Sequence, residues 1–216
     1  MTNVTLETAQ STTTWWWVRH ATVTGRQDRF PGDAARAATD RAALAAISVL
    51  AATLPLDALW LISPLARATA TADALRAVRP ELGGERLVED RFAEQDFGDW
   101  RGRTYDEVWD TDEGRRFWDA PASNRPPGGE SFTDVTARVT DAVKRWLGQA
   151  AGSDIVAVCH AGTIRAALCQ ALAATPEAAL GYEIDTLSLT RIDHLGAAAG
   201  GWRIGFVNRV AGATES

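Results

Sequence analysis

The sequence predicts an α/β protein built as a three-layer αβα sandwich, with a mostly parallel central sheet, an antiparallel edge and helices on both faces. Short continuous apolar runs, typical of strands buried on both faces, alternate along the chain with stretches of helical apolar spacing. Such alternation favours parallel βαβ units. Because no repeat or long linker interrupts it, we expect one domain over residues 14–210, after a flexible Thr-rich tail of residues 1–13.

The first half of the chain supplies three predicted strands and two helices. Thr14–Val18 is apolar on both faces and predicts a buried strand, and residues 40–54 carry Ala and Leu at helical spacing. Thr39 and Asp40 are the candidates for the cap of that helix. The remaining elements are a strand over residues 56–62, an Ala-rich helix over 66–78 and a short strand over 86–88, followed by an acidic loop over 89–100.

The second half alternates in the same way and ends in an antiparallel pair. Helical patches occur within residues 104–118, and the Pro- and Gly-rich stretch 120–130 predicts a loop. The elements that follow are a long amphipathic helix over 131–149, a buried strand over 154–159, a helix over 162–173, and two late strands over about 186–192 and 202–208. The turn at 196–201 joins those two strands.

Charge and composition exclude several classes of protein. The net charge of -6 and pI near 5.1 argue against a nucleic-acid or anionic-membrane binder. The apolar stretch 42–62 is broken by Pro55 and Asp57, so we expect no transmembrane span, and residues 1–14 show no signal-peptide pattern. With only Cys159 and Cys169, a reducing cytoplasm is the expected compartment. The oligomeric state is left open.

Basic side chains follow three of the predicted strands. The first strand ends in Arg19-His20, the second leads into Ser63-Pro64-Leu65-Ala66-Arg67, and the strand over 154–159 is followed by His160. Two of the three histidines of the chain are in this set. Because ligands bind at the carboxyl ends of parallel strands, we expect these side chains to form one cationic pocket.

The chemistry of this pocket suits a phosphoryl group. Arg guanidinium groups match phosphate oxygens in bidentate fashion, and the helix that begins after His160 adds free N–H groups and a positive dipole end. Ala161 leaves that approach open and is a candidate substrate contact. No Gly-rich P-loop is present. The spacing of His, Cys and carboxylate residues does not favour a metal site, so we expect no cofactor and no metal.

A nucleophile must then come from the protein. His20 is the candidate, because nearby cationic charges favour its neutral, attacking form. Cys159 is disfavoured, since it should point to the opposite face from His160. The proton donor for the leaving oxygen is expected in the acidic loop, where Glu94, Asp96 and Asp99 are candidates. For Asp96 and Asp99 a plain surface role is the preferred interpretation.

These motifs together resemble the histidine phosphatase (phosphoglycerate mutase-like) superfamily over residues 14–208. The resemblance lies in Arg19-His20 after an apolar strand, Arg67 in its Ser-Pro-Leu-Ala-Arg-Ala run, Glu94 before Phe-Gly-Asp-Trp, and His160 in Cys-His-Ala-Gly. The usual Arg-His-Gly signature here reads Arg19-His20-Ala21, which puts the loop geometry after the histidine in question.

The resemblance implies a role for each residue. His20 would be phosphorylated, while Arg19, Arg67 and His160 would bind the phosphoryl oxygens and stabilise the transition state. Glu94 would protonate the leaving group and then activate water. Two further residues, Thr22 and Thr24, are weaker candidates for substrate contact, and His194 matches no motif of the family.

The branch of the family is a separate question. The interval between Glu94 and His160 is short and holds Pro126-Pro127-Gly128-Gly129-Glu130-Ser131, which resembles the broad-specificity and α-ribazole phosphatases. This favours hydrolysis of a small phosphorylated metabolite, with α-ribazole 5'-phosphate as one candidate. Two alternatives stay open: phosphoglycerate mutase-type transfer, and a catalytically silent regulatory module on the same fold.

Overall fold

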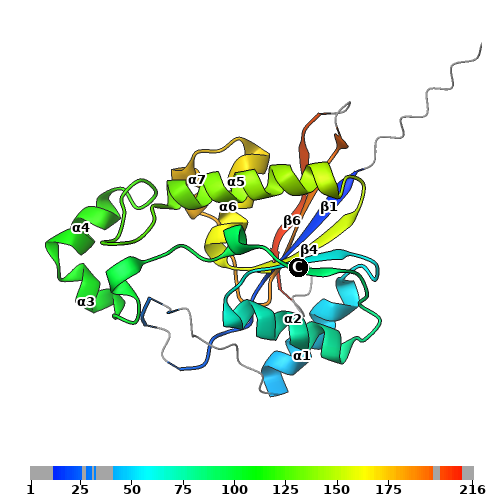
Figure 1. The fold of residues 1–216 in the computed structure, drawn as a ribbon. Coiled ribbons are helices and arrows are strands. Elements are labelled where there is room, and N and C mark those ends of the chain that lie inside the picture. The colour runs from blue at the N-terminus through cyan, green and yellow to red at the C-terminus, as the bar shows by residue number, and fades with distance from the viewer. Residues whose placement is uncertain (1–11, 26–27, 31, 33–40, 197–199, 211–216) are drawn as a thin grey trace, which may run out of the picture.

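A single six-stranded mixed sheet organises the molecule, with helices on both faces (Figure 1). The computed structural model describes residues 12–25, 28–30, 32, 41–196 and 200–210. The strand order is β3-β2-β4-β1-β5-β6. The strands are β1 (Thr13–Arg19), β2 (Leu59–Ile62), β3 (Arg86–Val88), β4 (Asp154–Cys159), β5 (Leu189–His194) and β6 (Trp202–Arg209).

The pairing within the sheet is parallel on one side and antiparallel on the other. The parallel part joins β1, β4, β2 and β3, whereas β5 runs antiparallel to both β1 and β6. The predicted mostly parallel sheet with an antiparallel edge is therefore confirmed. Because β1 lies between β4 and β5, the residue that follows it emerges near the middle of the sheet.

Seven α-helices and two short 3₁₀ helices lie within the described residues. The α-helices are α1 (Arg41–Thr53), α2 (Ala66–Val78), α3 (Tyr105–Trp109), α4 (Asp112–Asp119), α5 (Phe132–Gln149), α6 (Ala161–Leu172) and α7 (Pro176–Leu180). The 3₁₀ helices are η1 (Asp90–Phe92) and η2 (Gly98–Trp100). The sequence did not predict α7 or the two 3₁₀ helices, which are too short to show a period.

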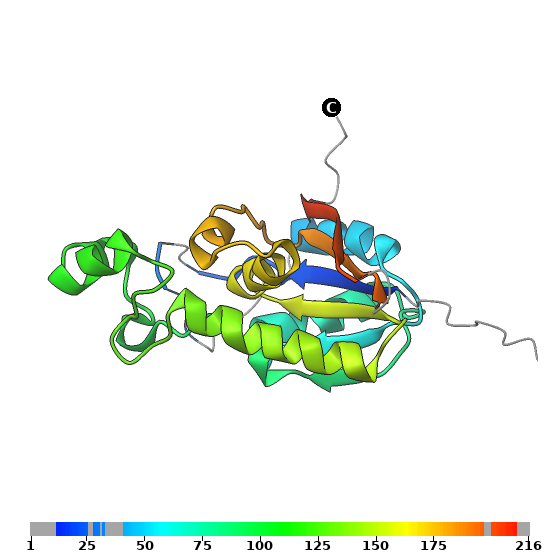
Figure 2. The same cartoon turned by 90° about the horizontal axis from the view of Figure 1, so that it is seen from above.

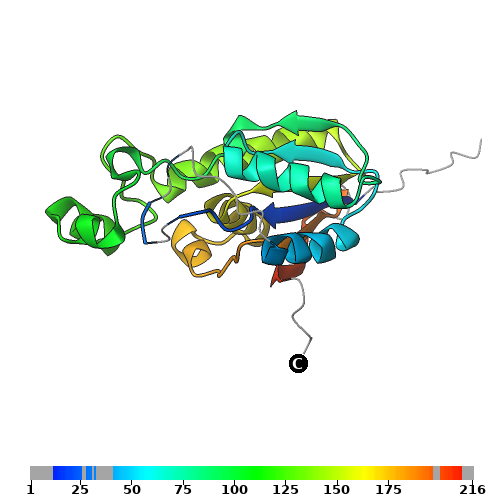
Figure 3. The same cartoon turned by 90° about the horizontal axis from the view of Figure 1, so that it is seen from below.

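Two cores separate the three layers, and β1 contributes to both. Trp15 and Trp17 pack with α5 and α6 in one core, while Val18 and the half-buried Trp16 pack with the α1–α2 side of the sheet. Successive side chains of a strand point to opposite faces, which accounts for this division. Figures 2 and 3 show the two faces, with α5 and α6 over one and α1 and α2 over the other.

Helices α3 and α4 project from the body of the molecule, beyond the carboxyl ends of the parallel strands (Figure 1). Side chains that begin these helices fix their starts. Thr104 forms a capping box with Glu107 at α3, and Thr111 accepts a hydrogen bond from Gly114 N at α4. This arrangement leaves α3 and α4 next to the end of the sheet where ligands of open α/β folds bind.

Three predicted boundaries are wrong. Thr13 belongs to β1 rather than to the tail, because it pairs with His194 and is buried; residues 1–11 lie outside the described residues. The strand predicted from residue 56 starts at Leu59, since Leu56 is exposed and its carbonyl accepts a hydrogen bond from Gly83. The strand predicted from residue 186 starts at Leu189, because Leu187 has a φ of 58°, which lies in the left-handed region and interrupts the extended backbone before β5.

Other predicted boundaries agree with the structure to within two residues. The helix expected over 131–149 begins at Phe132, with Ser131 as its N-cap in a capping box with Asp134. The capping candidates Thr39 and Asp40 lie outside the described residues. No helix among residues 12–25, 28–30, 32, 41–196 and 200–210 is both long and apolar enough to span a bilayer.

Candidate active site

His20 follows β1 directly and lies at the carboxyl end of the sheet. Its backbone N–H donates to the carbonyl of Cys159, which ties it to the neighbouring strand β4 at 3.0 Å. Its Nδ1 lies 2.7 Å from the carbonyl oxygen of Ala21. A carbonyl only accepts hydrogen bonds, so Nδ1 carries the proton, and Nε2 is the ring nitrogen with the free electron pair.

His160 follows β4, the parallel neighbour of β1, and is the N-cap residue of α6. The ring centroids of His20 and His160 are 5.0 Å apart. His160 is fully buried, and its Nε2 lies 2.7 Å from the hydroxyl oxygen of Ser63, which follows β2. Among the described residues, none offers a hydrogen-bond partner to the buried Nδ1 of His160. That nitrogen is therefore a hydrogen-bonding group that the described residues leave unpaired.

Arg19 and Arg67 place two guanidinium groups beside the histidines. Arg67 is in the first turn of α2, only 1% exposed, and donates to the carbonyl of Gly32 at 3.2 Å. Arg19, the last residue of β1, donates to the carbonyl of Ile184. Burial lowers the pKa of Arg19, whereas the carboxylates of Glu94 and Asp185 raise it. Arginine stays charged at neutral pH, so the pocket is cationic.

Both histidines are neutral in this environment. The pKa of His20 is lowered to about 3: burial is the largest cause, the hydrogen bond to the carbonyl of Ala21 opposes it, and the charges of Arg67 and Arg19 add to the lowering. Burial, followed by the positive charges around it, lowers the pKa of His160 well below its ordinary value. The sequence anticipated the effect of the positive charges on His20, whereas burial is the larger cause.

Glu94 lies across the first turn of α6. Its Oε1 accepts a hydrogen bond from Gln95 N at 3.0 Å, and its Oε2 accepts one from Gly162 N at 3.4 Å. A Cβ added at Gly162 would lie 2.3 Å from Oε1, so the carboxylate occupies space that only a glycine leaves. The structure therefore brings an acidic group and the start of α6 to the same strand ends as the two histidines.

The remaining predicted residues are placed as follows. Ala161 is the first residue of α6 and half-buried, next to His160. Thr22 is exposed, with its hydroxyl 2.8 Å from that of Thr186, and Thr24 is exposed farther along the same loop. Asp96 pairs with Arg101 and accepts a hydrogen bond from Gly98 N, in keeping with a surface role.

Two further residues lie close to the predicted site residues in sequence, Cys159 next to His160 and Trp100 after Glu94. Burial raises the pKa of the Cys159 thiol well above its ordinary value, so this cysteine is a poor nucleophile. Trp100, which follows Glu94 in sequence, is 2% exposed and packs against Phe30 and Phe117. It belongs to a small aromatic core and not to the wall of the pocket.

Several residues near Glu94 were not predicted as site residues from the sequence. Arg138 and Glu130 bond the backbone around Glu94, and Thr163 of α6 bonds the carbonyls that precede it. An arginine within an amphipathic helix has the same appearance in sequence as an ordinary surface charge, so only the tertiary structure identifies Arg138.

Two cavities lie next to these residues. One, of about 380 Å³, is lined by charged side chains that include Arg67, Glu94 and Arg138. The second, of about 480 Å³, is mainly apolar, and Phe97, Tyr105 and Arg165 are in its lining. Within the described part of the chain, no group of three or more His, Cys, Asp or Glu side chains is arranged to hold a metal ion.

Comparison with known proteins identifies the family to which this chain is similar. The model of the histidine phosphatase superfamily (branch 1) matches residues 15–209. A bifunctional protein of Mycobacterium tuberculosis is 37% identical over 130 residues, which is 59% of this chain and 35% of that protein. The match thus takes up about a third of that relative's length. A glucosyl-3-phosphoglycerate phosphatase of Mycolicibacterium vanbaalenii is 40% identical over 142 residues, covering 62% of this chain and 60% of the relative.

Solved structures share the fold over nearly the whole chain. A putative α-ribazole-5'-phosphate phosphatase from Escherichia coli superposes with a TM-score of 0.79 at 20% identity, covering 94% of this chain and 99% of that one. A mycobacterial glucosyl-3-phosphoglycerate phosphatase gives 0.76 at 22% identity, with 91% and 99% covered. At these identities the similarity shows a common fold.

Proposed function

The chain belongs to the histidine phosphatase superfamily, branch 1, and we propose that it hydrolyses a small phosphomonoester through a phosphohistidine on His20, without a metal ion. One observation carries the proposal most directly. A buried, neutral His20 with its proton on Nδ1 presents Nε2 beside His160, Arg19 and Arg67. A neutral nucleophile among fixed positive charges is suited to a dianionic phosphoryl group.

In the first step, His20 Nε2 attacks phosphorus while the bond from phosphorus to the leaving oxygen breaks. The charge on the three equatorial oxygens is stabilised by the guanidinium groups of Arg19 and Arg67. His160, with Nδ1 unpartnered among the described residues, adds a hydrogen bond to the same oxygens. The leaving oxygen takes its proton from Glu94.

In the second step, water attacks the phosphorus of the phosphohistidine. Glu94, now ionised, accepts a proton from that water, the nitrogen–phosphorus bond breaks, and inorganic phosphate leaves. Glu94 thereby returns to its protonated form, so protons and atoms balance over the cycle. The carboxylate that serves both steps must stay close to His20, which the hydrogen bonds from Gln95 and Gly162 favour.

Hydrolysis is preferred over transfer between positions of one substrate. The relatives whose names state an activity are phosphatases, and the interval between Glu94 and His160 is short. Within the phosphatase branch, α-ribazole 5'-phosphate and glucosyl-3-phosphoglycerate are the first substrates to examine.

The proposal is tested by measuring phosphate release from a panel of esters that includes these two compounds and the phosphoglycerates. Wild-type protein is expected to release phosphate in the presence of a chelator. His20→Ala should reduce kcat by at least about 10³-fold, because the covalent route is lost. A labelled substrate should leave phosphohistidine on wild type but not on this variant.

His194→Ala is the matched control. His194 lies at the far end of β5, where its ring contacts Trp202, and it should be replaceable without loss of activity. Three results would contradict the proposal: full activity in His20→Ala, loss of wild-type activity with the chelator, or no phosphohistidine with any ester. Interconversion of phosphoglycerates that is faster than hydrolysis would support the mutase alternative instead.

A further inference from the structure

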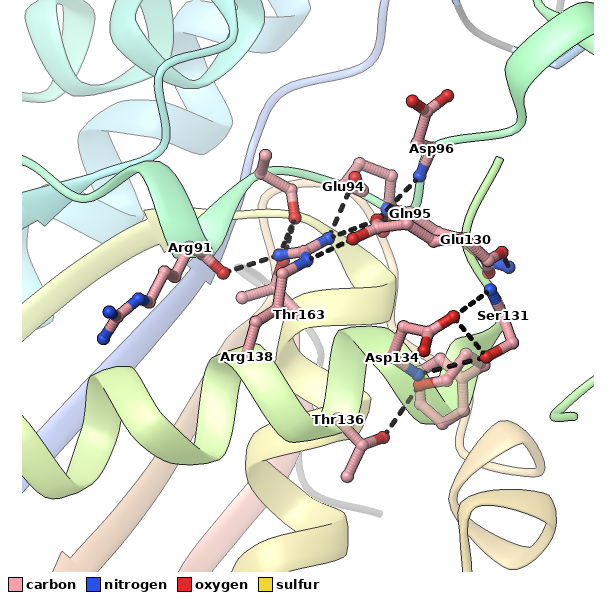
Figure 4. Close-up of polar contacts among 12 residues, drawn as sticks. Arg91, Glu94, Gln95, Asp96, Glu130, Ser131, Asp134, Thr136, Arg138 and Thr163 are labelled. Carbon is pink, nitrogen blue, oxygen red and sulfur yellow. Dashed lines mark hydrogen bonds and ion pairs between the residues drawn. The ribbon is translucent and has the colours of Figure 1, made fainter. Parts of the chain in front are cut away.

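The segment that carries Glu94 is held by side chains rather than by regular secondary structure. We call residues 89–96 the Glu94 segment. Figure 4 shows Arg138 of α5 reaching across it: Nη1 donates to the carbonyls of Arg91 and Ala93 at 2.6 and 2.9 Å. Nη2 donates to the carbonyl of Glu94 itself at 3.2 Å. One guanidinium therefore binds three carbonyls of the segment.

Glu130 binds the remaining donors of the Arg138 guanidinium and also contacts the Glu94 segment. Its two carboxylate oxygens accept from Nε and Nη2 of Arg138 at 2.9 and 3.0 Å, and Oε2 also accepts from Asp96 N at 3.1 Å. The backbone carbonyl of Glu130 accepts from the side chain of Gln95 at 2.8 Å. Both side chains are largely buried, with 20% of Arg138 and 30% of Glu130 exposed.

Other contacts fix the beginning of the same segment. Thr163 of α6 donates to the carbonyls of Phe92 and Ala93 at 3.1 and 3.2 Å. The buried Glu89 accepts from the indole of Trp146 at 2.6 Å and pairs with Arg145. None of these contacts reaches Glu94 or the residues after it, whose backbone is instead bonded by the side chains of Arg138, at the Glu94 carbonyl, and Glu130, at Asp96 N.

We propose that Arg138 and Glu130 are a positioning pair for Glu94: they set where its carboxylate stands relative to the leaving oxygen. This inference rests on the proposed role of Glu94 as proton donor. Arg138 needs the planar fork of a guanidinium, because it uses all three of its nitrogens on five acceptors. A lysine ammonium is a single point charge with three donors and cannot span the same set.

The pair should therefore affect one chemical step selectively. An alkyl phosphate has a poor leaving group, so its cleavage depends on a well-placed acid. An aryl ester such as 4-nitrophenyl phosphate releases a phenolate that is stable without that proton, so its cleavage depends on the acid much less. Misplacing Glu94 should reduce kcat/KM for the alkyl ester much more than for the aryl ester.

The experiment compares kcat/KM for both esters in wild type, Arg138→Lys and Glu130→Gln. We use kcat/KM because it covers the steps up to formation of the phosphohistidine. The ratio of the two values within one variant is independent of how much of that variant is folded. We expect both variants to lower the alkyl-to-aryl ratio by about 10-fold to 10²-fold, the scale of a misplaced catalytic group.

Arg125→Lys is the matched control. Arg125 precedes α5 and pairs at 2.7 Å with Asp134, which lies on α5 as Arg138 does, but Arg125 does not contact the Glu94 segment. Its ratio should equal that of wild type. If Arg138→Lys lowers both esters by the same factor, the pair has a structural role only and the inference is overturned. If wild type cleaves neither ester nor any other, the proposed function itself fails, which is a separate result.

A double-mutant cycle gives a second, independent measure. Glu94→Gln alone should lower the same ratio, because the amide cannot donate the proton of the acid. When Arg138→Lys is added to Glu94→Gln, the ratio should not fall further, since there is no acid left to misplace. A further fall of the full single-mutant size would show that Arg138 acts independently of Glu94, and would contradict the inference.

Discussion

At the scale of single residues, the pocket combines charged arginines with neutral histidines. The positive charge comes from Arg19 and Arg67, which remain ionised, whereas burial keeps His20 and His160 neutral. A protonated His20 would have no electron pair to attack phosphorus. The same burial that keeps this histidine neutral should make the folded protein sensitive to acid.

Ala21, the residue that departs from the usual signature, causes no backbone strain here. It is not among the described non-glycine residues with positive φ, which are Ala173, Leu187 and Asn208. Its N–H donates to the hydroxyl of Thr71 at 2.9 Å, and its methyl group is buried in the core below α2. A glycine is not required at this position in this chain.

A prediction at this scale concerns stability against pH in His20→Asn. The pKa of His20 is about 3 in the folded protein and 6.5 as its ordinary value. Between these values the unfolded chain binds more protons, so folding stability falls as the pH falls through this window. From about pH 7.5 to about pH 5, His20→Asn should lose about 2 kcal/mol less stability than wild type.

Urea unfolding at the two pH values measures this difference. His194→Asn serves as the control, because His194 pairs with Thr13 at the start of β1, whereas His20 follows the end of that strand. Its loss of stability between the two pH values should equal that of wild type. Equal losses in wild type and His20→Asn would show that His20 is protonated in the folded protein within this range. It would then need to lose a proton before it could attack phosphorus.

At the scale of elements, the start of α6 and the Glu94 segment are fitted to each other. Gly162, in the first turn of α6, donates to Glu94 and leaves room for its carboxylate. Thr163, one residue later, bonds the carbonyls of the segment that precede Glu94. The start of α6 therefore carries His160 as its N-cap and supports the Glu94 segment through Gly162 and Thr163.

Gly162→Ala tests this fit. The added methyl group would lie 2.3 Å from Glu94 Oε1, the end of a flexible side chain, so the carboxylate should move rather than the helix. Activity toward alkyl phosphates should fall by about 10²-fold, the lower end of what a general acid contributes. Thermal stability should change little, because alanine is favoured over glycine within a helix.

Gly148→Ala, on the exposed side of α5, is the matched control. An added Cβ there meets nothing within 4 Å, so activity should stay at the wild-type level. Unchanged activity in Gly162→Ala would show that Glu94 can work from another position. It would weaken the assignment of Glu94 as the acid.

At the scale of the whole molecule, the topology of the sheet gathers the site. His20, Ser63 and His160 follow β1, β2 and β4, which are consecutive parallel strands in the order β2-β4-β1. Their carboxyl ends lie at one edge of the sheet, next to the projecting α3 and α4 (Figure 1). Residues separated by up to 140 positions in sequence thereby reach one pocket.

The prediction at this scale is that residues 14–210 unfold as one cooperative unit. Buried tryptophans of the sheet, such as Trp15 and Trp60, and exposed ones in the projecting helices, such as Trp109 and Trp118, report on different regions. Denaturant curves from tryptophan fluorescence and far-UV circular dichroism should coincide. An earlier fluorescence transition that disappears in a Trp109→Phe, Trp118→Phe double variant would contradict a single unit.

The sequence by itself determined the fold class and the main residues of the pocket. Apolar strands buried on both faces have a recognisable pattern, and the candidate site residues placed directly after them, such as His20 and His160, inherit their position from the strand. Boundaries were less certain where a backbone dihedral decided them. The start of β5 is set by the positive φ of Leu187, and a leucine side chain gives no indication of a positive φ in the sequence.

Only the tertiary structure decided which side chains hold the Glu94 segment and how far the pKa values of His20 and His160 are lowered. Arg138 has no sequence feature that separates it from a surface arginine, because its five acceptors come from Glu130 and from backbone carbonyls more than 40 residues away. The low pKa of His20 depends mainly on burial, which is a property of the packed molecule. Local patterns therefore specify where functional groups leave the sheet, whereas packing specifies their surroundings.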